Sequence, residues 1–307
     1  MNNGLLYALT VLIWGSTFFA IEFQLGVVAP EVSIFYRFAS ASALLFGWSA
    51  SRGLKLRFAA REHLRFATLG ILLFGINYVL TYNSQQYIVS ALAAIAFATL
   101  PWLNMLNGRL LFGTRTTPRV VLGAVVGVVG ITTVFSPQIS DFSFDDATFY
   151  GFALALLAAL SASFGNMASQ SAQRAELPIL QSNAWGMLYG ALCVGCIAAF
   201  SGEAFTFDLS AGYVISLAYL TVFGSIVAFG AYLTLLGRIG ADKAGYATVV
   251  FPVIAVALSA LFEGLAIDAT TATGFALVLV GNVLVLGGNK KRTDAVASMP
   301  SSKPLLP

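Results

Sequence analysis

The chain has 307 residues, of which 58% are hydrophobic and only 9% are charged. Because soluble domains carry about 25% charged residues, this composition excludes a water-soluble fold and predicts an all-α integral membrane protein in a lipid bilayer. The net charge of +3 is too small and too dispersed to predict a nucleic-acid partner.

Polar residues divide the chain into ten apolar segments, each close to the roughly 20 residues that cross a bilayer. They cover residues 4–23, 31–51, 64–83, 87–108, 118–135, 148–172, 182–201, 212–236, 244–264 and 272–288. The first segment lacks the basic start and the cleavage site of a signal peptide, so it is expected to be a retained span. Residues 289–307 are expected to form a basic anchor and a disordered cytoplasmic tail.

The first two spans each carry one unusual residue. Trp14 lies about ten residues into its span, or ~15 Å at 1.5 Å per residue, and its indole N–H needs a partner at that depth. A wall of a cavity would suit it. Arg37 lies six positions into the second span. Two interpretations of Arg37 stay open: an ion pair with Glu22 or Glu31 (or snorkelling to the surface), or a clamp for a substrate carboxylate.

The third span, GINYVLTYNSQQ, carries polar and aromatic residues at helical spacing, and this face should point away from lipid. It contains Asn77, Tyr78, Thr81, Tyr82 and Gln85.

The fourth span contains AFATLPWLNMLNG (96–108), where Pro101 stands between Thr99 and Trp102. Proline removes a backbone donor and leaves the carbonyl of Phe97 without its helical partner. Such a defect survives in lipid only where protein or cavity water satisfies it. A single proline also fits a packing kink, but a central polar cavity explains its polar neighbours as well.

The later spans divide into packing and lining elements. GAVVGVVG and GFALVLVGN, in the fifth and tenth spans, indicate helices packed through glycine. SASFGNMASQ, in the sixth, places Ser163, Asn166 and Ser169 on one face, which suits either substrate or close helix packing. Cys193 and Cys196 (CVGC) are expected to be two buried thiols in a membrane helix rather than a redox or zinc half-site.

Residues near the inner ends of the spans indicate a membrane interface. Tyr7 and Tyr246 are predicted to belong to an aromatic belt, and His63, in a basic loop, is predicted to be solvated. If the N-terminus is cytoplasmic, fifteen of the sixteen basic residues fall in inner loops or the tail, and the outer loops hold acids. This asymmetry predicts ten spans with both termini in the cytoplasm.

The chain also repeats itself. A shift of 151 residues places AFATLPWLNMLNG over ATVVFPVIAVALS (247–259), and so Pro101 over Pro252. The same shift aligns Gly113 with Gly264, Gly123 with Gly274, and Gly130 with Gly281. Residues 1–138 and 147–288 are therefore predicted to be related halves joined by an outer linker, 139–146. Because each half has five spans, the second is inverted, which is typical of transporters with a central cavity.

With WGSTFFAIE, IFYRF and SALAAIAFATLPWLNMLNGRLLFG, these features resemble the drug/metabolite transporter superfamily over roughly residues 4–288. Within it the chain resembles the EamA-type exporters, and most closely those that export aromatic amino acids. The resemblance implies export from the cytoplasm across a bacterial inner membrane. One departure is Glu263 before Gly264, where the first half has Phe112 before Gly113.

The sequence thus predicts a secondary transporter that works by alternating access and that can function as a monomer. Aromatic walls suit a zwitterionic aromatic amino acid, and the alternative is another metabolite or an organic cation, moved with proton coupling. No acid lies clearly at mid-membrane, which favours facilitated transport. No H-E-x-x-H, G-x-S-x-G or Walker A motif occurs, so neither an enzyme nor a cofactor is expected. The predicted substrate-binding residues are Trp14, Arg37, Asn77, Tyr78, Tyr82, Thr99, Pro101, Trp102, Asn166 and Pro252.

Overall fold

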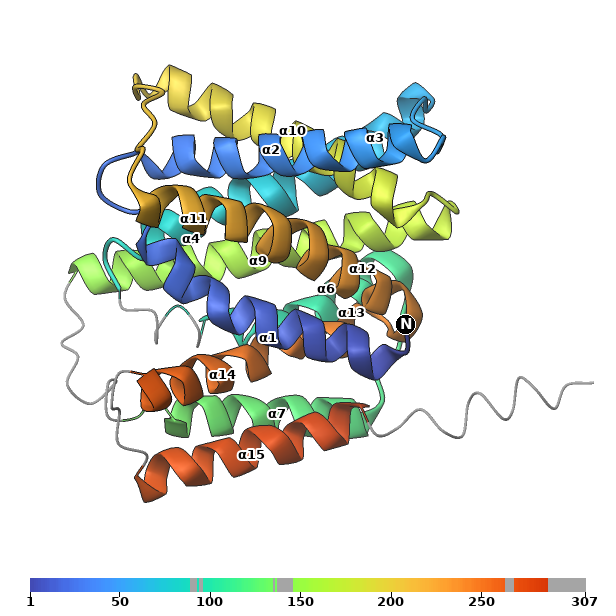
Figure 1. The fold of residues 1–307 in the computed structure, drawn as a ribbon. Helices are drawn as coiled ribbons and strands as arrows, with labels where there is room; N and C mark the ends of the chain where they lie inside the picture. Colours follow the sequence, from blue (N-terminus) through green and yellow to red (C-terminus); the bar gives the residue numbers. More distant parts are fainter. Residues whose placement is uncertain (89–92, 94–95, 135, 137–145, 263–267, 287–307) are drawn as a thin grey trace, which may run out of the picture.

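The computed structural model is a bundle of helices (Figure 1). It describes residues 1–88, 93, 96–134, 136, 146–262 and 268–286, without the side chains of Phe18, Phe19, Glu22, Asp146 and 255–262. No strand occurs in these ranges. Residues 139–145 of the predicted linker (139–146), Glu263 and the predicted tail, 289–307, lie outside the described residues, whereas Asp146 begins α9.

Most of the helices follow the predicted apolar segments, but α6 begins only at Leu100 and ends at Phe112, against the predicted 87–108. Two long helices are composites in which a π-helical stretch joins two α-helical ones. The elements are α1 (Asn3–Glu22), α2 (Pro30–Ser51), α3 (Ala60–Leu69) with η1 (Gly70–Ile76) and α4 (Asn77–Ser84), α6 (Leu100–Phe112), α7 (Pro118–Val134), α9 (Asp146–Arg174), α10 (Ile179–Phe200), α11 (Ala211–Tyr219) with η2 (Leu220–Val227) and α12 (Ala228–Ile239), α13 (Ala241–Gly245), α14 (Ala247–Phe262) and α15 (Ala269–Leu286).

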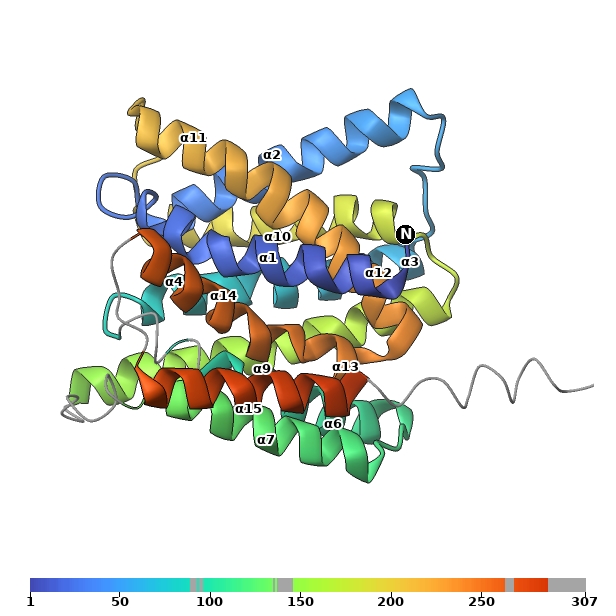
Figure 2. The same cartoon turned by 60° about the horizontal axis from the view of Figure 1, so that its bottom comes forward.

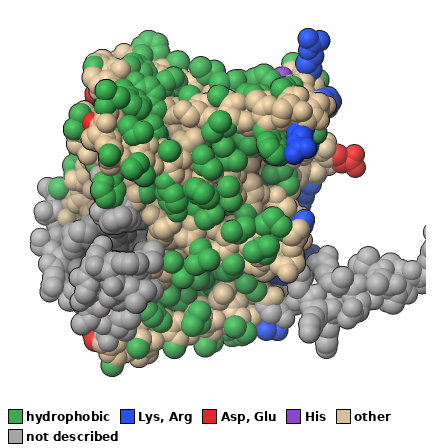
Figure 3. All heavy atoms as spheres, in the orientation of Figure 1, with side chains coloured by type: hydrophobic (Ala, Val, Ile, Leu, Met, Phe, Trp, Pro, Cys, Tyr) green, Lys and Arg blue, Asp and Glu red, His purple; other side chains and the backbone are tan. Residues whose placement is uncertain are grey.

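The outer surface of the bundle suits lipid. Among the described residues, five helices are long and apolar enough to cross a membrane: Ala60–Ser84, Ala147–Arg174, Ile179–Phe200, Ala211–Ile239 and Ala269–Leu286. Large apolar side chains such as Leu44, Leu110 and Val283 are exposed on their helices. In Figure 3 the visible Lys and Arg side chains gather at one end, where Figure 1 places the N-terminus. An apolar belt beside a basic end is the surface of a membrane protein.

Helices α7 and α15 pack side by side at one edge of the bundle (Figures 1 and 2), and in Figure 1 the packed pair α2 and α10 lies at the opposite edge. The α7–α15 contact is made through glycine, as predicted. A Cβ on Gly281 would lie 2.7 Å from the carbonyl oxygen of Gly123, and a Cβ on Gly130 would lie 2.9 Å from that of Gly274. Such backbone-to-backbone contact excludes any larger residue.

Three predictions about polar residues near the helix ends are wrong. Tyr246 is fully buried rather than part of an interfacial belt, and its hydroxyl donates to the carbonyl of Gly123 at 3.2 Å. His63 is half-buried, with Nδ1 2.9 Å from the hydroxyl of Tyr189. Cys196 is exposed, although it and Cys193 are free thiols. Apolar periodicity does not separate a protein-facing side of a membrane helix from a lipid-facing one, because both are apolar.

Candidate substrate cavity

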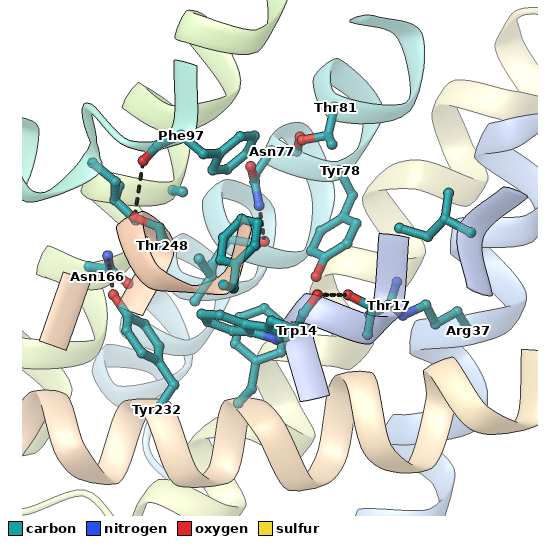
Figure 4. A pocket seen from close by; sticks show the side chains of 16 residues that line it. Trp14, Thr17, Arg37, Asn77, Tyr78, Thr81, Phe97, Asn166, Tyr232 and Thr248 are labelled. Carbon is teal, nitrogen blue, oxygen red and sulfur yellow. Dashed lines mark hydrogen bonds between the residues drawn. The ribbon is translucent and has the colours of Figure 1, made fainter. Parts of the chain in front are cut away.

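A cavity of about 90 Å³ lies inside the bundle (Figure 4). Its wall draws on α1, α2, the composite α3–η1–α4 helix, α6, α9, α12 and α14. The lining residues are Trp14, Thr17, Ile21, Arg37, Leu73, Asn77, Tyr78, Thr81, Phe97, Leu100, Ala162, Asn166, Phe229, Tyr232, Thr248 and Phe251. Residues from both ends of the sequence therefore meet around one space.

Five predicted substrate-binding residues line this cavity: Trp14, Arg37, Asn77, Tyr78 and Asn166. On the composite α3–η1–α4 helix, one polar face presents both Asn77 and Tyr78. Thr81 from the same predicted face joins them. The polar groups that the sequence placed away from lipid thus converge, as expected for side chains that lipid would penalise.

The other five predicted residues lie beside the cavity but do not line it. The ring of Tyr82 is buried in the core. Thr99 donates its hydroxyl to the carbonyl of Ala96, and Pro101 packs against Gly245. Half-buried Trp102 packs on the cluster that contains Tyr246. Pro252 is buried inside α14.

The chain breaks differently at the two matched prolines. Before Pro101 a turn at Ala98 and Thr99 interrupts the helix, so that Pro101 lies in the first turn of α6. That position needs no proline N–H. Pro252 instead stays inside α14, and the break comes earlier, at Tyr246 between α13 and α14. One proline starts a helix, and the other is tolerated within one.

Aromatic rings form much of the wall. The Trp14 ring centroid lies 5.0 Å from that of Phe229, edge to face, and 4.9 Å from that of Tyr232. Phe97, Phe229 and Phe251 carry no sequence signal that distinguishes them from lipid-facing phenylalanines. Tyr232 has one, a hydroxyl deep within an apolar segment. Offset and edge-to-face geometry of this kind is how aromatic groups recognise one another.

Among the described residues that line the cavity, Arg37 is the one that carries a charge. Its side chain is 2% exposed, and Nε donates to the hydroxyl of Ser225 in η2 at 2.8 Å. The guanidinium carbon lies 4.9 Å from the centre of the Tyr78 ring, a cation–π contact. The structure fixes the guanidinium from two sides.

The predicted ion pair between Arg37 and Glu31 is wrong. Glu31 lies in the first turn of α2 and accepts a hydrogen bond from Nδ2 of Asn83 at 2.9 Å. Across the described side chains, no carboxylate pairs with Arg37, and the side chain of Glu22 is outside that set. Burial on α2 also rules out snorkelling.

A hydrogen-bond network bounds one side of the cavity. Asn166 Nδ2 donates to the Tyr232 hydroxyl at 2.9 Å and to Asn104 Oδ1 at 3.2 Å. Asn104 Nδ2 in turn donates to the carbonyl of Ala241 at 2.9 Å. The network joins α6, α9, α12 and α13 close to Lys243, on the basic side of the bundle. Asn166 and Tyr232 line the cavity, whereas Asn104 lines a second pocket together with Lys243.

The predicted polar face of the sixth span serves both of the roles that the sequence left open. Asn166 lines the cavity, whereas Ser163 accepts a hydrogen bond from Asn107 of α6 in helix packing. Ser169 accepts one from Gln173 of its own helix, α9. No cluster of His, Cys, Asp or Glu suited to a metal occurs where the structure describes the chain.

Comparison with known proteins identifies the class to which this fold and cavity belong. The chain is a member of the EamA-like transporter family, whose model matches residues 2–136 and 149–287. It is 30% identical over 287 residues to the uncharacterized inner membrane transporter YedA of Escherichia coli (strain K12), covering 93% of this chain and 90% of YedA. The protein is therefore a multi-pass membrane transporter.

Two further likenesses are more distant. A probable amino-acid metabolite efflux pump of Escherichia coli (strain K12) is 22% identical, over 91% of this chain and 93% of its own. A crystal structure of a protein with 19% identity superposes with a TM-score of 0.77, over 92% of this chain and 96% of that one. At this identity the structural match concerns the fold alone.

Proposed function

We propose that this transporter exports small amino-acid-like metabolites, aromatic amino acids foremost, from the cytoplasm by alternating access. The observation that carries the proposal is a cavity inside the bundle with aromatic walls and one buried cation. Similarity to a probable amino-acid metabolite efflux pump supports the same substrate class. The cellular location would be a bacterial inner membrane, as the name of YedA says of that relative.

The walls favour an aromatic side chain. Trp14, Tyr78, Phe229 and Tyr232 offer ring faces and edges, and each aromatic pair adds about 0.5–1.5 kcal/mol beyond area burial. The present volume of about 90 Å³ is well below the roughly 300–1,000 Å³ of ligand pockets. Substrate binding would therefore have to spread the walls, which suits a protein that changes shape as it works.

We further propose ten membrane crossings arranged as two inverted halves, 1–138 and 147–288. The two separate matches to the family model support this division. The reciprocal glycine contacts, Gly123 with Gly281 and Gly130 with Gly274, support a two-fold relationship. The π-helical stretches support it too, because a 151-residue shift places η1 within η2. Inverted halves allow one fold to open to either side.

The orientation follows from charge. The basic end would face the cytoplasm, with both termini there. The network of Asn104, Asn166 and Tyr232 would then close the cytoplasmic side of the cavity. No acid lines the cavity in the described chain, so transport without tight proton coupling is the simplest mechanism.

Uptake into proteoliposomes tests the proposal. Purified protein is supplied with labelled phenylalanine, tryptophan, threonine or an organic dication, with and without a pH gradient. Aromatic amino acids are expected to be taken up both with and without the pH gradient. Trp14→Ala should abolish this uptake, while Trp102→Ala, a tryptophan outside the cavity, should retain it. Transport of the dication alone, or strict dependence on the pH gradient, would favour the proton-coupled alternative.

A further inference from the structure

Four buried polar atoms in the cavity wall have no hydrogen-bond partner in the protein. They are the donors Trp14 Nε1 and Arg37 Nη1 and the acceptors Asn77 Oδ1 and Asn166 Oδ1. All four residues line the cavity. Buried polar groups are normally paired, and each one left unpaired is costly. Their gathering in one space indicates a ligand that supplies the missing partners.

Other polar groups of the same wall are already satisfied. The hydroxyls of Thr17, Thr81 and Thr248 donate to the backbone carbonyls of Trp14, Asn77 and Phe97, respectively. Asn77 Nδ2 donates to the carbonyl of Leu73 at 3.2 Å. The protein thus uses both amide nitrogens and leaves both amide oxygens free. The set that remains is two donors, one of them charged, and two neutral acceptors.

The charged donor and the neutral acceptors differ in the strength of the hydrogen bonds that they form with a ligand. A guanidinium binds a carboxylate by charge-assisted hydrogen bonds, about twice as strong as neutral ones. The acceptors that would receive a substrate ammonium are neutral amide oxygens. Loss of the carboxylate leaves a buried cation unpaired, whereas loss of the ammonium leaves only neutral acceptors unpaired.

From this inequality we infer that the cavity selects its substrate by the carboxylate and not by the ammonium group. Its substrate class then includes 2-oxo acids and 2-hydroxy acids with aromatic side chains, and excludes the corresponding amines. The inference rests on the proposed substrate cavity and narrows what that cavity accepts.

The placement of the groups also orients the ligand. In Figure 4, Arg37 lies on one side of the cavity, Asn166 and Tyr232 lie on the other, and Trp14 and Asn77 lie between them. The carboxylate binds at Arg37 and the ring lies beside Trp14. An ammonium or hydroxyl group on the adjacent carbon donates to Asn77 Oδ1, whereas a 2-oxo group, itself an acceptor, leaves that oxygen unpaired. A donor at the far end of the ring, such as a phenol hydroxyl, then faces Asn166 Oδ1.

The test is a binding panel on the purified wild-type full-length protein. The probes are phenylalanine, phenylpyruvate, 3-phenyllactate, phenethylamine and the aliphatic 2-oxobutyrate, measured by calorimetry at one pH and salt concentration. The three aromatic acids are expected to bind within about tenfold of one another. Phenethylamine should bind about 10- to 100-fold more weakly than phenylalanine, as expected for one lost charge-assisted interaction.

Variants add a second, independent readout. Arg37→Gln should remove the preference, so that phenylalanine binds no better than phenethylamine, and Arg37→Lys should restore part of it. Asn77→Leu should weaken the binding of phenylalanine but leave the affinity for phenylpyruvate within a few-fold of the wild-type value. The wild-type panel decides the matter even where a variant fails to fold.

Each outcome separates the inference from the proposed function. Equal binding of phenethylamine and phenylalanine would overturn carboxylate selection and leave aromatic transport standing. Binding of phenylpyruvate and 2-oxobutyrate without phenylalanine would support carboxylate selection and refute amino-acid transport. If none of the five probes binds, both are wrong.

Discussion

The hydroxyl of Thr248 donates a hydrogen bond of 3.0 Å to the backbone carbonyl of Phe97, and the two residues are 151 positions apart. That separation is the shift that places Pro101 over Pro252. Pro101 has no N–H with which to satisfy the Phe97 carbonyl. A side chain at the matching position of the other half takes its place, so the interrupted helix is held across the molecule.

This bond makes Thr248 important for stability. Thr248→Val removes the donor and leaves the partly buried carbonyl of Phe97 without this partner, so the free energy of unfolding should fall by about 1 kcal/mol. Thr248→Ser keeps the hydroxyl and should lose much less. The measurement is unfolding in detergent followed by tryptophan fluorescence. Thr234→Val is the matched control: the Thr234 hydroxyl donates to the carbonyl of Gly230 in its own helix, whereas the Thr248 hydroxyl is shared between the local Gly245 carbonyl at 2.8 Å and the distant Phe97 carbonyl. Equal losses at both sites would contradict the prediction.

The glycine contact between α7 and α15 gives a second prediction. Gly281→Ala places a methyl group against the Tyr246 hydroxyl and 2.7 Å from the Gly123 carbonyl oxygen, so Tyr246 must move and the helices must separate, at a cost of about 1–3 kcal/mol. Gly47→Ala in α2 meets nothing within 4 Å and should instead stabilise by about 0.5–1 kcal/mol. Thermal unfolding of both variants checks the opposite signs. Two shifts of the same sign would show that the close contact does not set stability.

The network at the basic side should control access to the cavity. Asn104→Ala removes the links to Asn166 and Ala241 and should open that side. A cysteine replacing Leu100, in a chain that lacks Cys193 and Cys196, is expected to react about tenfold faster with a thiol reagent supplied from the basic side. Asn107→Ala on the same helix breaks only a bond to Ser163 and should leave the rate unchanged. Unaltered labelling in Asn104→Ala would refute closure by this network.

Asp268 predicts a pH dependence of stability. Its carboxylate accepts from the backbone N–H of Thr271 at 2.7 Å, and this hydrogen bond holds the pKa of the carboxyl below its usual value. Because the folded-state pKa is lowered, the stabilisation is present above the ordinary pKa of about 3.9 and is lost as pH falls through the folded value. Asp268→Asn keeps the helix cap without titrating. The unfolding midpoint of the wild-type protein should therefore lie above that of Asp268→Asn at about pH 6, and the two midpoints should converge as the pH falls to about 3. A constant difference between them over this range would contradict the prediction.

Some of the architecture was readable from the sequence, and the reason is physical. Helix positions follow apolar length, as in the predicted 182–201 against the observed α10 (Ile179–Phe200). Polar residues in lipid spans must face protein, so Asn77, Tyr78 and Asn166 were assigned to an inner face. The glycine seam was predicted because close helix packing in membranes needs small residues.

The remainder depends on groups that a membrane sequence does not distinguish. Phe229 lines the cavity although an identical phenylalanine on another face would contact lipid. Trp102 lies outside the cavity. Its predicted depth in the membrane did not reveal this, because depth does not fix the direction in which a side chain points. The π-helical stretches η1 and η2 contain no proline, and nothing in their sequences predicts π-helical geometry. In η2, Ser225 fixes Arg37. These features arise from packing between distant segments.

The paired contacts of Gly123 with Gly281 and of Gly130 with Gly274 have a consequence for motion. Under the proposed inverted repeat, exchanging the two halves turns each of these contacts into the other, so the seam is identical in inward-open and outward-open forms. Helices α7 and α15 would then be the stationary pivot of the transport cycle. The energy difference between the two open forms would have to come from elsewhere, from residues such as Arg37 and Asn104 that have no counterpart in the other half.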